Sequence, residues 1–258
     1  MKAVIVAAGM GSRILDYPTT ESDKLSSDLY LQIKNHSDNQ IPKSLLPFAE
    51  GTILSTILNN IAKAGIKQFV IVVGFKSQYV INYLKKNDHF GFKISFVENP
   101  EWKKGNGISV LSAEKEVGKD SFLLSMSDHI VSVAAIEKVV RYRTSKNLLL
   151  VDPKLENIFD IDDATKVQTT GNMITNIGKQ IQEYNGIDCG IFKLSSRFFI
   201  SMREKLKNKQ ESITASVQGL IQNNDMEAVF MNENDFWIDI DTLDSYQYAL
   251  QNLLPKVQ

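Results

Sequence analysis

The sequence predicts an α/β protein in which a mostly parallel sheet lies between two layers of helices. Short apolar runs without polar alternation are typical of strands buried on both faces, and they occur at residues 3–8, 69–73, 122–126 and 148–151. Segments with apolar residues at helical spacing separate these runs, and parallel strands need such crossovers. These two observations together predict a three-layer sandwich.

The helices between these strands have recognisable ends. The clearest is expected at residues 53–64, where Thr52 is the predicted N-cap and Gly65 the C-terminal stop. Further elements are expected as helices at 77–86 and 107–117 and as a short strand at 94–97.

The second half of the chain changes character and is expected to add a small β-hairpin region. Residues 165–169 and 173–177 flank Thr170-Gly171-Asn172, whose composition is typical of a hairpin turn. The elements expected after it are strands at 187–193 and 227–231 and helices at 196–207, 213–223 and 242–253. We predict a single domain, 1–258, with a first half at 1–151 and a second half at 152–258.

Residues 14–41 fit this pattern poorly, because they are polar, weakly periodic and rich in Ser, Asp and Asn. A long irregular insertion is usually either a lid over a site or a mobile surface loop. The sequence leaves both interpretations open for this inserted loop.

Composition limits the class of partner. The 29 basic and 30 acidic residues give a net charge of −1, whereas a nucleic-acid-binding protein usually has a basic excess.

The single cysteine cannot form an internal disulfide, which is typical of a reducing, cytoplasmic location. No apolar run approaches the roughly 20 residues of a membrane span, and the short N-terminal run is better read as the first strand than as a signal peptide.

A glycine-rich loop follows the first predicted strand. Gly9 and Gly11 let the backbone approach a phosphate closely, and Arg13 can neutralise its charge. Ile14 stands where a dinucleotide-binding fingerprint has its third glycine, and no Walker A lysine follows. The loop therefore indicates a phosphate site of another kind, and a tight turn with a surface arginine is the alternative.

Two aspartates are candidate metal ligands. Asp128 follows the strand at 122–126, and the carboxyl edge of an open α/β sheet is where ligands bind. Asp239 is the second candidate, and a pair of carboxylates suits Mg²⁺. An isolated aspartate more often solvates a strand end or caps a helix, and Asp241 is expected to be such a case. A lone His129 is expected to support the site or the fold rather than to bind metal.

Residues 7–13, followed by 42–47 (Pro-Lys-Ser-Leu-Leu-Pro), resemble the signature of the sugar-nucleotide and alcohol-phosphate nucleotidyltransferases. The resemblance implies a Rossmann-like fold of the nucleotide-diphospho-sugar transferase type. It also implies that the loop wraps the phosphates of an NTP while Arg13 and Lys43 stabilise charge as pyrophosphate leaves. The family usually has a shorter linker than residues 14–41 at this point.

The same resemblance implies further site residues. Ser127-Asp128 and Trp237-Ile238-Asp239 match the family's metal-ligand segments, which implies Mg²⁺ bound by Asp128 and Asp239. The implied nucleotide-binding residues are Ala7, Ala8, Gly9, Gly11, Ser12, Arg13, Lys43, Gly74, Gly105, Asn106, Gly107 and Asp128. Gly105-Asn106-Gly107 matches the base-recognition segment, where an Asn amide can pair with a pyrimidine edge; a plain helix-entry turn is the alternative.

Several ordered segments resemble the inositol-1-phosphate cytidylyltransferase branch of this family: 104–109, 126–129, 162–167, 177–179 and 184–192. The resemblance implies transfer of CMP from CTP to inositol-1-phosphate. It also implies that Lys179 reaches the acceptor phosphate, as a catalytic residue beside Arg13, Lys43 and Asp128. Acceptor binding is expected from Lys179, Tyr184, Asn185 and Asp188, with Asp162 and Asp163 as further candidates for the inositol hydroxyls.

Three alternatives remain open from the sequence. A phosphocholine cytidylyltransferase needs an aromatic cation site, for which Trp102 and Tyr184 are the candidates. A sugar-1-phosphate nucleotidyltransferase is another. A non-catalytic nucleotide-binding regulatory subunit would be expected to lack the Arg13, Lys43, Asp128 or Asp239 equivalents that this chain keeps. Some relatives are fused to a membrane-embedded CDP-alcohol phosphotransferase, so a functional link to such an enzyme is expected.

Overall fold

The computed structural model describes residues 1–15, 27–39 and 41–254. The strands are β1 Lys2–Ala7, β2 Pro47–Phe48, β3 Gly51–Thr52, β4 Gln68–Val73, β5 Lys93–Glu98, β6 Phe122–Met126, β7 His129–Val131, β8 Asn147–Asp152, β9 Lys166–Thr170, β10 Met173–Gly178, β11 Gly186–Leu194, β12 Met226–Phe230 and β13 Trp237–Asp239. The helices are α1 Ser12–Leu15, α2 Ser27–Asp38, α3 Ile53–Lys63, α4 Ser77–Lys86, α5 Asn106–Ser112, α6 Glu114–Val117, α7 Val133–Arg141, α8 Arg197–Leu206, α9 Ile213–Gln222 and α10 Leu243–Asn252.

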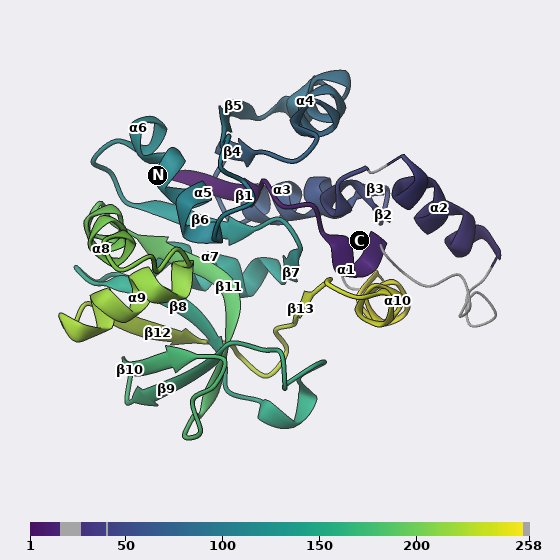
Figure 1. The fold of residues 1–258 in the computed structure, drawn as a ribbon. Coiled ribbons are helices and arrows are strands. Elements are labelled where there is room, and N and C mark those ends of the chain that lie inside the picture. Colours follow the sequence, from purple (N-terminus) through teal and green to yellow (C-terminus); the bar gives the residue numbers. More distant parts are fainter. Residues whose placement is uncertain (16–26, 40, 255–258) are drawn as a thin grey trace.

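Nine strands form one sheet in the order β5-β4-β1-β6-β11-β8-β12-β10-β9 (Figure 1). Strands β5, β4, β1 and β6 are parallel to one another, as expected. Strand β11 then runs antiparallel to both of its neighbours, and the β9–β10 hairpin adds further antiparallel pairs. The sheet is therefore mixed, and the prediction of a mostly parallel sheet is correct only for strands β5, β4, β1 and β6 and for the β8–β12 pair. An apolar run indicates that a strand is buried on both faces of the sheet, but it does not indicate in which direction the strand runs.

Helices cover both faces of the sheet, which gives the predicted three layers. Alternate residues of a strand point to opposite faces. Ala3 and Ile5 of β1 accordingly pack into the core under α3, α7 and α10, whereas Val4 and Val6 pack into the core under α5, α8 and α9 (Figure 1). The first strand, whose carboxyl end carries the glycine loop, is thus fixed from both sides.

Helix α3 has the predicted N-cap, because the Thr52 side chain accepts a hydrogen bond from the Ser55 N–H in a capping box. Gly65 follows its end with φ +106°. The helix expected at 107–117 is interrupted, and α5 and α6 meet at Ala113.

Several elements were not predicted. Residues 14–41 include α2, so the described part of this segment contains regular structure. Helix α7 follows β7, whose three residues pair antiparallel with β13 in a small separate sheet. Strands of three residues are too short to show an alternation of apolar and polar residues, so they could not be predicted from the sequence. The β7–β13 pair lies beside the main sheet and brings residues from two distant parts of the chain together. Over the described residues, no helix has both the length and the apolar character that a membrane crossing requires.

Candidate active site

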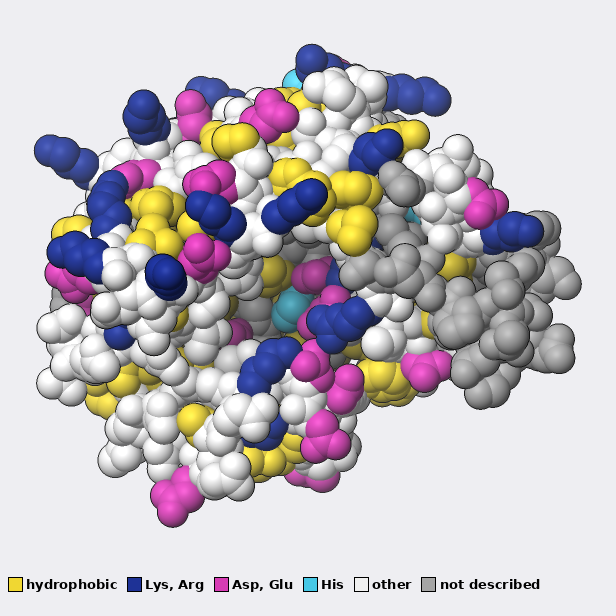
Figure 2. Space-filling view, viewed as in Figure 1, with side chains coloured by type: hydrophobic (Ala, Val, Ile, Leu, Met, Phe, Trp, Pro, Cys, Tyr) yellow, Lys and Arg dark blue, Asp and Glu magenta, His cyan; other side chains and the backbone are white. Residues whose placement is uncertain are grey.

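Two adjoining cavities open at the carboxyl ends of β1 and β6. The first, of about 310 Å³, is lined by the glycine loop, Lys43 and Trp102. The second, of about 430 Å³, is lined by residues of the second half, including Lys179 and Asp188. Arg13 and Asp128 line both. Figure 2 shows the hollow as a cleft with histidine and carboxylate side chains at its floor and basic side chains along its edges. The site thus lies where open α/β sheets bind ligands.

The glycine loop and Lys43 fit closely together. Gly11 has φ +71°, and a Cβ at this position would lie 2.4 Å from the Cβ of Lys43. Lys43 begins a short 3₁₀ helix and is only 6% exposed. A side chain at residue 11 would therefore push this lysine out of its buried position.

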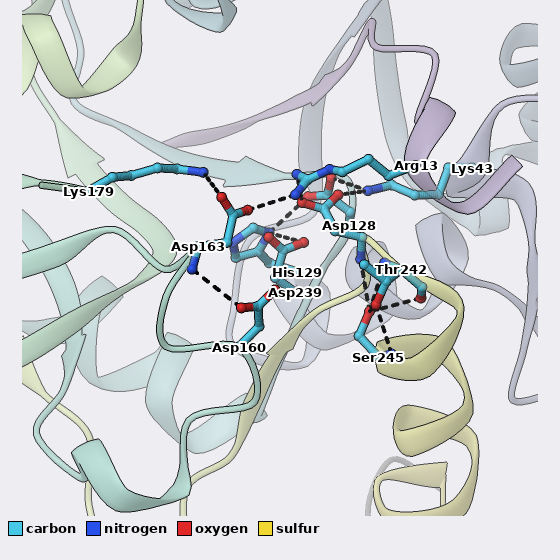
Figure 3. A network of polar contacts seen from close by, with 11 residues as sticks. Arg13, Lys43, Asp128, His129, Asp160, Asp163, Lys179, Asp239, Thr242 and Ser245 are labelled. Atoms are coloured by element: carbon cyan, nitrogen blue, oxygen red, sulfur yellow. Dashed lines mark hydrogen bonds and ion pairs between the residues drawn. The ribbon is translucent and has the colours of Figure 1, made fainter. Parts of the chain in front are cut away.

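The Lys43 ammonium is the centre of a charge cluster. Its Nζ lies 2.8 Å from Oδ2 of Asp128 and also pairs with the carboxylate of Asp241 (Figure 3). Burial alone would lower the pKa of Lys43, but the neighbouring carboxylates outweigh it and raise the pKa well above its usual value. Burial alone would raise the pKa of Asp128, yet Lys43 and His129 hold it far below its usual range. Both partners therefore stay charged.

A second set of ion pairs joins the glycine loop to the second half of the chain. Arg13 contacts Asp163 at 2.7 Å and also pairs with Asp241. The same Asp163 carboxylate accepts a hydrogen bond from Lys179 at 2.6 Å (Figure 3). Hydrogen bonds from Lys179 and Arg13 lower the pKa of Asp163. All three side chains line the second cavity, and Arg13 also lines the first, so this bridge reaches the boundary between the two cavities.

Asp128, His129 and Asp239 form a cluster that could hold a metal ion, with one potential ligand atom from each lying within 4.8 Å of the others. The buried Oδ1 of Asp239 accepts no hydrogen bond from any described residue and lies 3.7 Å from Nδ1 of His129. Burial, with Asp128 and Asp241 close by, raises the pKa of Asp239 to about 7. Burial lowers the pKa of His129, but the carboxylates of Asp239, Asp128 and Asp188 raise it to about 9. An unsatisfied carboxylate oxygen beside a second carboxylate fits a divalent cation.

Comparison with known proteins then identifies the family. Residues 3–156 match the family described as the MobA-like NTP transferase domain. The chain belongs to this family. The match covers the glycine loop, Lys43 and Asp128.

Relatives and solved structures extend the similarity over the whole chain. The chain is 30% identical over 254 residues, 98% of its length, to a "Bifunctional IPC transferase and DIPP synthase" of Thermococcus kodakarensis, and 30% identical over 252 residues, again 98%, to one of Aquifex aeolicus. It covers 50% and 51% of these two proteins, so it spans about half the length of the curated relatives it matches. Its fold is similar to that of the inositol-1-phosphate CTP transferase from T. maritima, with a TM-score of 0.82 and 22% identity over 99% of this chain and 95% of that one.

In this NTP transferase, the predicted nucleotide-binding residues occupy different positions around the first cavity. Of the predicted residues, those that line it are Gly9, Gly11, Arg13, Lys43, Asn106 and Asp128. Ala7 and Ala8 are buried in or just after β1, and the Ala8 carbonyl accepts a hydrogen bond from Phe75 N. A Cβ on Gly74 would lie 2.4 Å from the Trp102 Cβ. The absence of a side chain at residue 74 therefore leaves room for Trp102 in the wall of the cavity. The side chain of Ser12 lies outside the described residues.

The Gly105-Asn106-Gly107 turn of the NTP transferase packs against residue 211. A Cβ on Gly105 would lie 2.4 Å from the Glu211 carbonyl oxygen, and Gly107 N donates to the same oxygen at 2.9 Å. Both glycines are therefore accounted for by this close approach. Asn106 lines both cavities, and its Oδ1 accepts a hydrogen bond from Ile213 N at 2.9 Å, whereas its NH₂ group donates to no other described residue.

The four predicted acceptor residues separate into two groups. Lys179 and Asp188 line the second cavity, and burial raises the pKa of Asp188 to about 6. Tyr184 and Asn185 do not line it. The Asn185 side chain bonds to the backbone N and O of Thr169 at 2.9 and 3.2 Å, and the Tyr184 ring lies beneath the Lys166 ammonium. These two residues hold the hairpin region together.

The structure adds residues that sequence analysis missed. Asp241 was expected to cap the last helix, but the N-cap is Thr242 in a capping box with Ser245, so this expectation is wrong. The Asp241 carboxylate instead joins Arg13 to Lys43. Asp241 lies two residues after Asp239, and residues two apart on an extended chain point to the same side. This spacing was the signal in the sequence that could have placed Asp241 in the site. Asp163 was considered only for acceptor hydroxyls, and its ion pairs with Arg13 and Lys179 had no signal in the sequence.

Proposed function

We propose that this chain transfers CMP from CTP to inositol-1-phosphate, giving CDP-inositol and pyrophosphate. The observation that carries the proposal is the set of three cations, Arg13, Lys43 and Lys179, that converge through shared carboxylates at the junction of two cavities. A transfer between two anionic substrates requires such cations, because they offset the repulsion between the phosphates. The names of the relatives support the choice of reaction within the NTP transferase family.

In this proposal the first cavity takes the nucleotide. The glycine loop and Arg13 bind the triphosphate, and Lys43 is placed to stabilise charge as the pyrophosphate leaves. The NH₂ group of Asn106 can donate to an acceptor atom on the edge of cytosine. Asp128 and Asp239 would hold Mg²⁺, which when bound would neutralise negative charge on the phosphates.

The second cavity would take the acceptor. Lys179 binds its phosphate, and Asp188 accepts hydrogen bonds from ring hydroxyls. An oxygen of the acceptor phosphate attacks the α-phosphorus of CTP, and the bond from that phosphorus to the pyrophosphate oxygen breaks. The chain's own contribution is to position two anions and to offset their charge, as in other phosphoryl and nucleotidyl transfers.

Phosphocholine is the second candidate acceptor, because aromatic side chains line the second cavity. They are Phe159, Phe192, Phe236, Trp237 and Tyr248. Aromatic faces together with carboxylates attract a quaternary ammonium. The aromatic residues expected for this role from the sequence, Trp102 and Tyr184, are not among them. A non-catalytic subunit is disfavoured, since Arg13, Lys43, Asp128 and Asp239 are all retained and lie together.

The decisive experiment measures pyrophosphate release with Mg²⁺ and each of CTP, UTP, ATP and GTP, combined with inositol-1-phosphate, phosphocholine or glucose-1-phosphate. We expect the highest kcat/KM with CTP and inositol-1-phosphate, because a site that hydrogen-bonds a base or a hydroxyl rejects a mismatched group. Faster turnover with phosphocholine would show that inositol-1-phosphate is not the preferred acceptor. Equal turnover with a purine triphosphate would show that the site does not select cytosine. No turnover with any pair would overturn the proposal.

We also propose that the chain is one domain with a nucleotide half and an acceptor half, and that its product is used by a CDP-alcohol phosphotransferase. The domain assignment is supported by the single nine-stranded sheet, to which both halves contribute strands. The link to a second activity is supported by the bifunctional names of the relatives, of which this chain covers about half.

A further inference from the structure

The His129 imidazole lies in a slot built by distant residues. Its Nδ1 is 2.8 Å from Oδ1 of Asp128, and its ring is stacked on the Trp237 indole, with 5.9 Å between ring centroids and 19° between the planes. Gly190, with φ +74°, also adjoins the ring, since a Cβ there would lie 2.4 Å from His129 Cδ2. Any side chain at residue 190 would therefore displace the imidazole.

The small β7–β13 sheet sets this arrangement. Asp239 is directly opposite His129 in the antiparallel register, and Trp237 is opposite Val131. Residues two apart on a strand share a face, so Trp237 and Asp239 lie on the same side, within reach of His129. The stacked indole and the metal-ligand candidate are thus parts of one short strand.

A buried carboxylate fixes the indole in turn. Asp152 is only 5% exposed, and its Oδ2 accepts a hydrogen bond from Trp237 Nε1 at 2.9 Å. Its Oδ1 accepts from Lys154 N at 3.0 Å. Because both oxygens of this carboxylate are engaged, the indole has a defined orientation as well as a defined position.

We infer that Trp237 is a positioning residue, held by Asp152, that keeps the His129 imidazole aimed at Asp128 and Asp239. The inference rests on the proposed nucleotidyl transfer for its effect on turnover, but the positioning itself is a property of the folded chain. Removing a side chain that hydrogen-bonds to a metal ligand typically costs about 10–100-fold in metal affinity or activity, and His129 has this relation to Asp128.

The test compares Trp237→Phe and Trp237→Leu with the wild-type protein. Phe keeps a ring for stacking but loses the N–H, whereas Leu loses both. Phe199→Leu is the matched control, because it removes a fully buried ring that is stacked on Phe122 at 5.3 Å, in the core under α8.

Two readouts separate positioning from folding. The chain has only three histidines, so the imidazole signals of a protein labelled with ¹⁵N-histidine are easily resolved, and loss of one signal in His129→Gln assigns His129. We expect one sharp His129 signal in the wild type and in Phe199→Leu, and a broadened or doubled signal in Trp237→Leu. We expect kcat to fall at least tenfold in Trp237→Leu, less in Trp237→Phe, with the KM for CTP within about threefold.

A Trp237→Leu protein with an unshifted, sharp His129 signal would overturn the inference, even if its Tm fell. So would a signal that broadens equally in Phe199→Leu. The histidine signals need no substrate, so their outcome is separate from that of the proposed function: an inactive wild type whose His129 signal still depends on Trp237 would refute CMP transfer and support positioning.

Discussion

Lys43 and Asp128 are 85 positions apart in the sequence, yet they form an ion pair with Nζ 2.8 Å from Oδ2 in the interior of the cleft. The pair joins the segment that follows the glycine loop to the end of β6. Asp241 completes it from the segment before the last helix. One lysine therefore ties together three separate parts of the site.

Removing this lysine should destabilise the fold as well as abolish activity. Lys43→Met removes the cation that two partly buried carboxylates share and leaves them only His129 and Arg13, and breaking a buried pair typically costs about 3–5 kcal/mol. We expect the double variant Lys43→Met/Asp128→Asn to be more stable than Lys43→Met alone, because one uncompensated charge is gone. Urea unfolding of the wild type, both single variants and the double variant gives the coupling free energy. Strictly additive losses would contradict the pairing.

Asp239→Asn should abolish most turnover while leaving the metal-free fold intact. Burial, Asp128 and Asp241 disfavour the ionised form of this carboxylate more than His129 favours it, so a neutral side chain of the same shape removes a net penalty. We expect an unchanged or higher Tm without metal, a kcat lower by orders of magnitude, and loss of the Tm increase that Mg²⁺ gives the wild type. Asp128→Asn should also lose turnover. Near-normal Mg²⁺-dependent activity in either variant would show that the metal ligands are assigned wrongly.

The close approach of Gly11 to Lys43 predicts a sharp difference between two neighbouring glycines. Gly11→Ala forces a side chain into the left-handed region, at a cost of about 1–2 kcal/mol, and against the Lys43 Cβ. A Cβ on Gly9 would meet nothing within 4 Å among the described residues. Thermal unfolding should show a clear loss of Tm for Gly11→Ala and little change for Gly9→Ala. Equal effects would argue against the packing of Lys43 on the loop.

Lys179→Ala should act on the acceptor and not on the nucleotide. We expect a higher KM for the acceptor and a lower kcat, with little change in CTP binding, because Lys179 lines the second cavity. Loss of one charge-stabilising group in the transition state typically costs about 2.7–4 kcal/mol. Steady-state kinetics with each substrate varied in turn provides the measurement. Unchanged kinetics with the acceptor would show that Lys179 does not bind it.

Asp163→Asn tests whether the bridging carboxylate competes with the substrates. Asp163 holds both Arg13 and Lys179, and all three side chains are half-exposed, so each pair is worth roughly 0–1 kcal/mol. Releasing Lys179, and releasing Arg13 from one of its two carboxylates, should lower the KM for CTP and for the acceptor by up to about fivefold. If instead only the acceptor KM rises, Asp163 binds an acceptor hydroxyl and its ion pairs are incidental.

The local elements and the residue types of the site could be predicted from the sequence alone. Apolar runs and helical spacing located the strands of the first half, and Thr52 marked the start of α3, because burial and capping depend on neighbouring residues. The glycine loop, Lys43, Asp128 and Asp239 were all recognisable from short motifs. Each of these signals lies within a few residues of the feature it predicts.

Strand direction and charge pairing could not be predicted without the three-dimensional fold. The antiparallel entry of β11 makes the sheet mixed, and no periodicity encodes it. The same holds for Asp241, which pairs with Arg13 and Lys43 instead of capping a helix, and for Asn185, which binds the hairpin backbone. An ion pair forms only where the fold brings two side chains within about 4 Å. Lys43 is 85 positions from Asp128 and 198 positions from Asp241, so no local sequence pattern indicates that they are close.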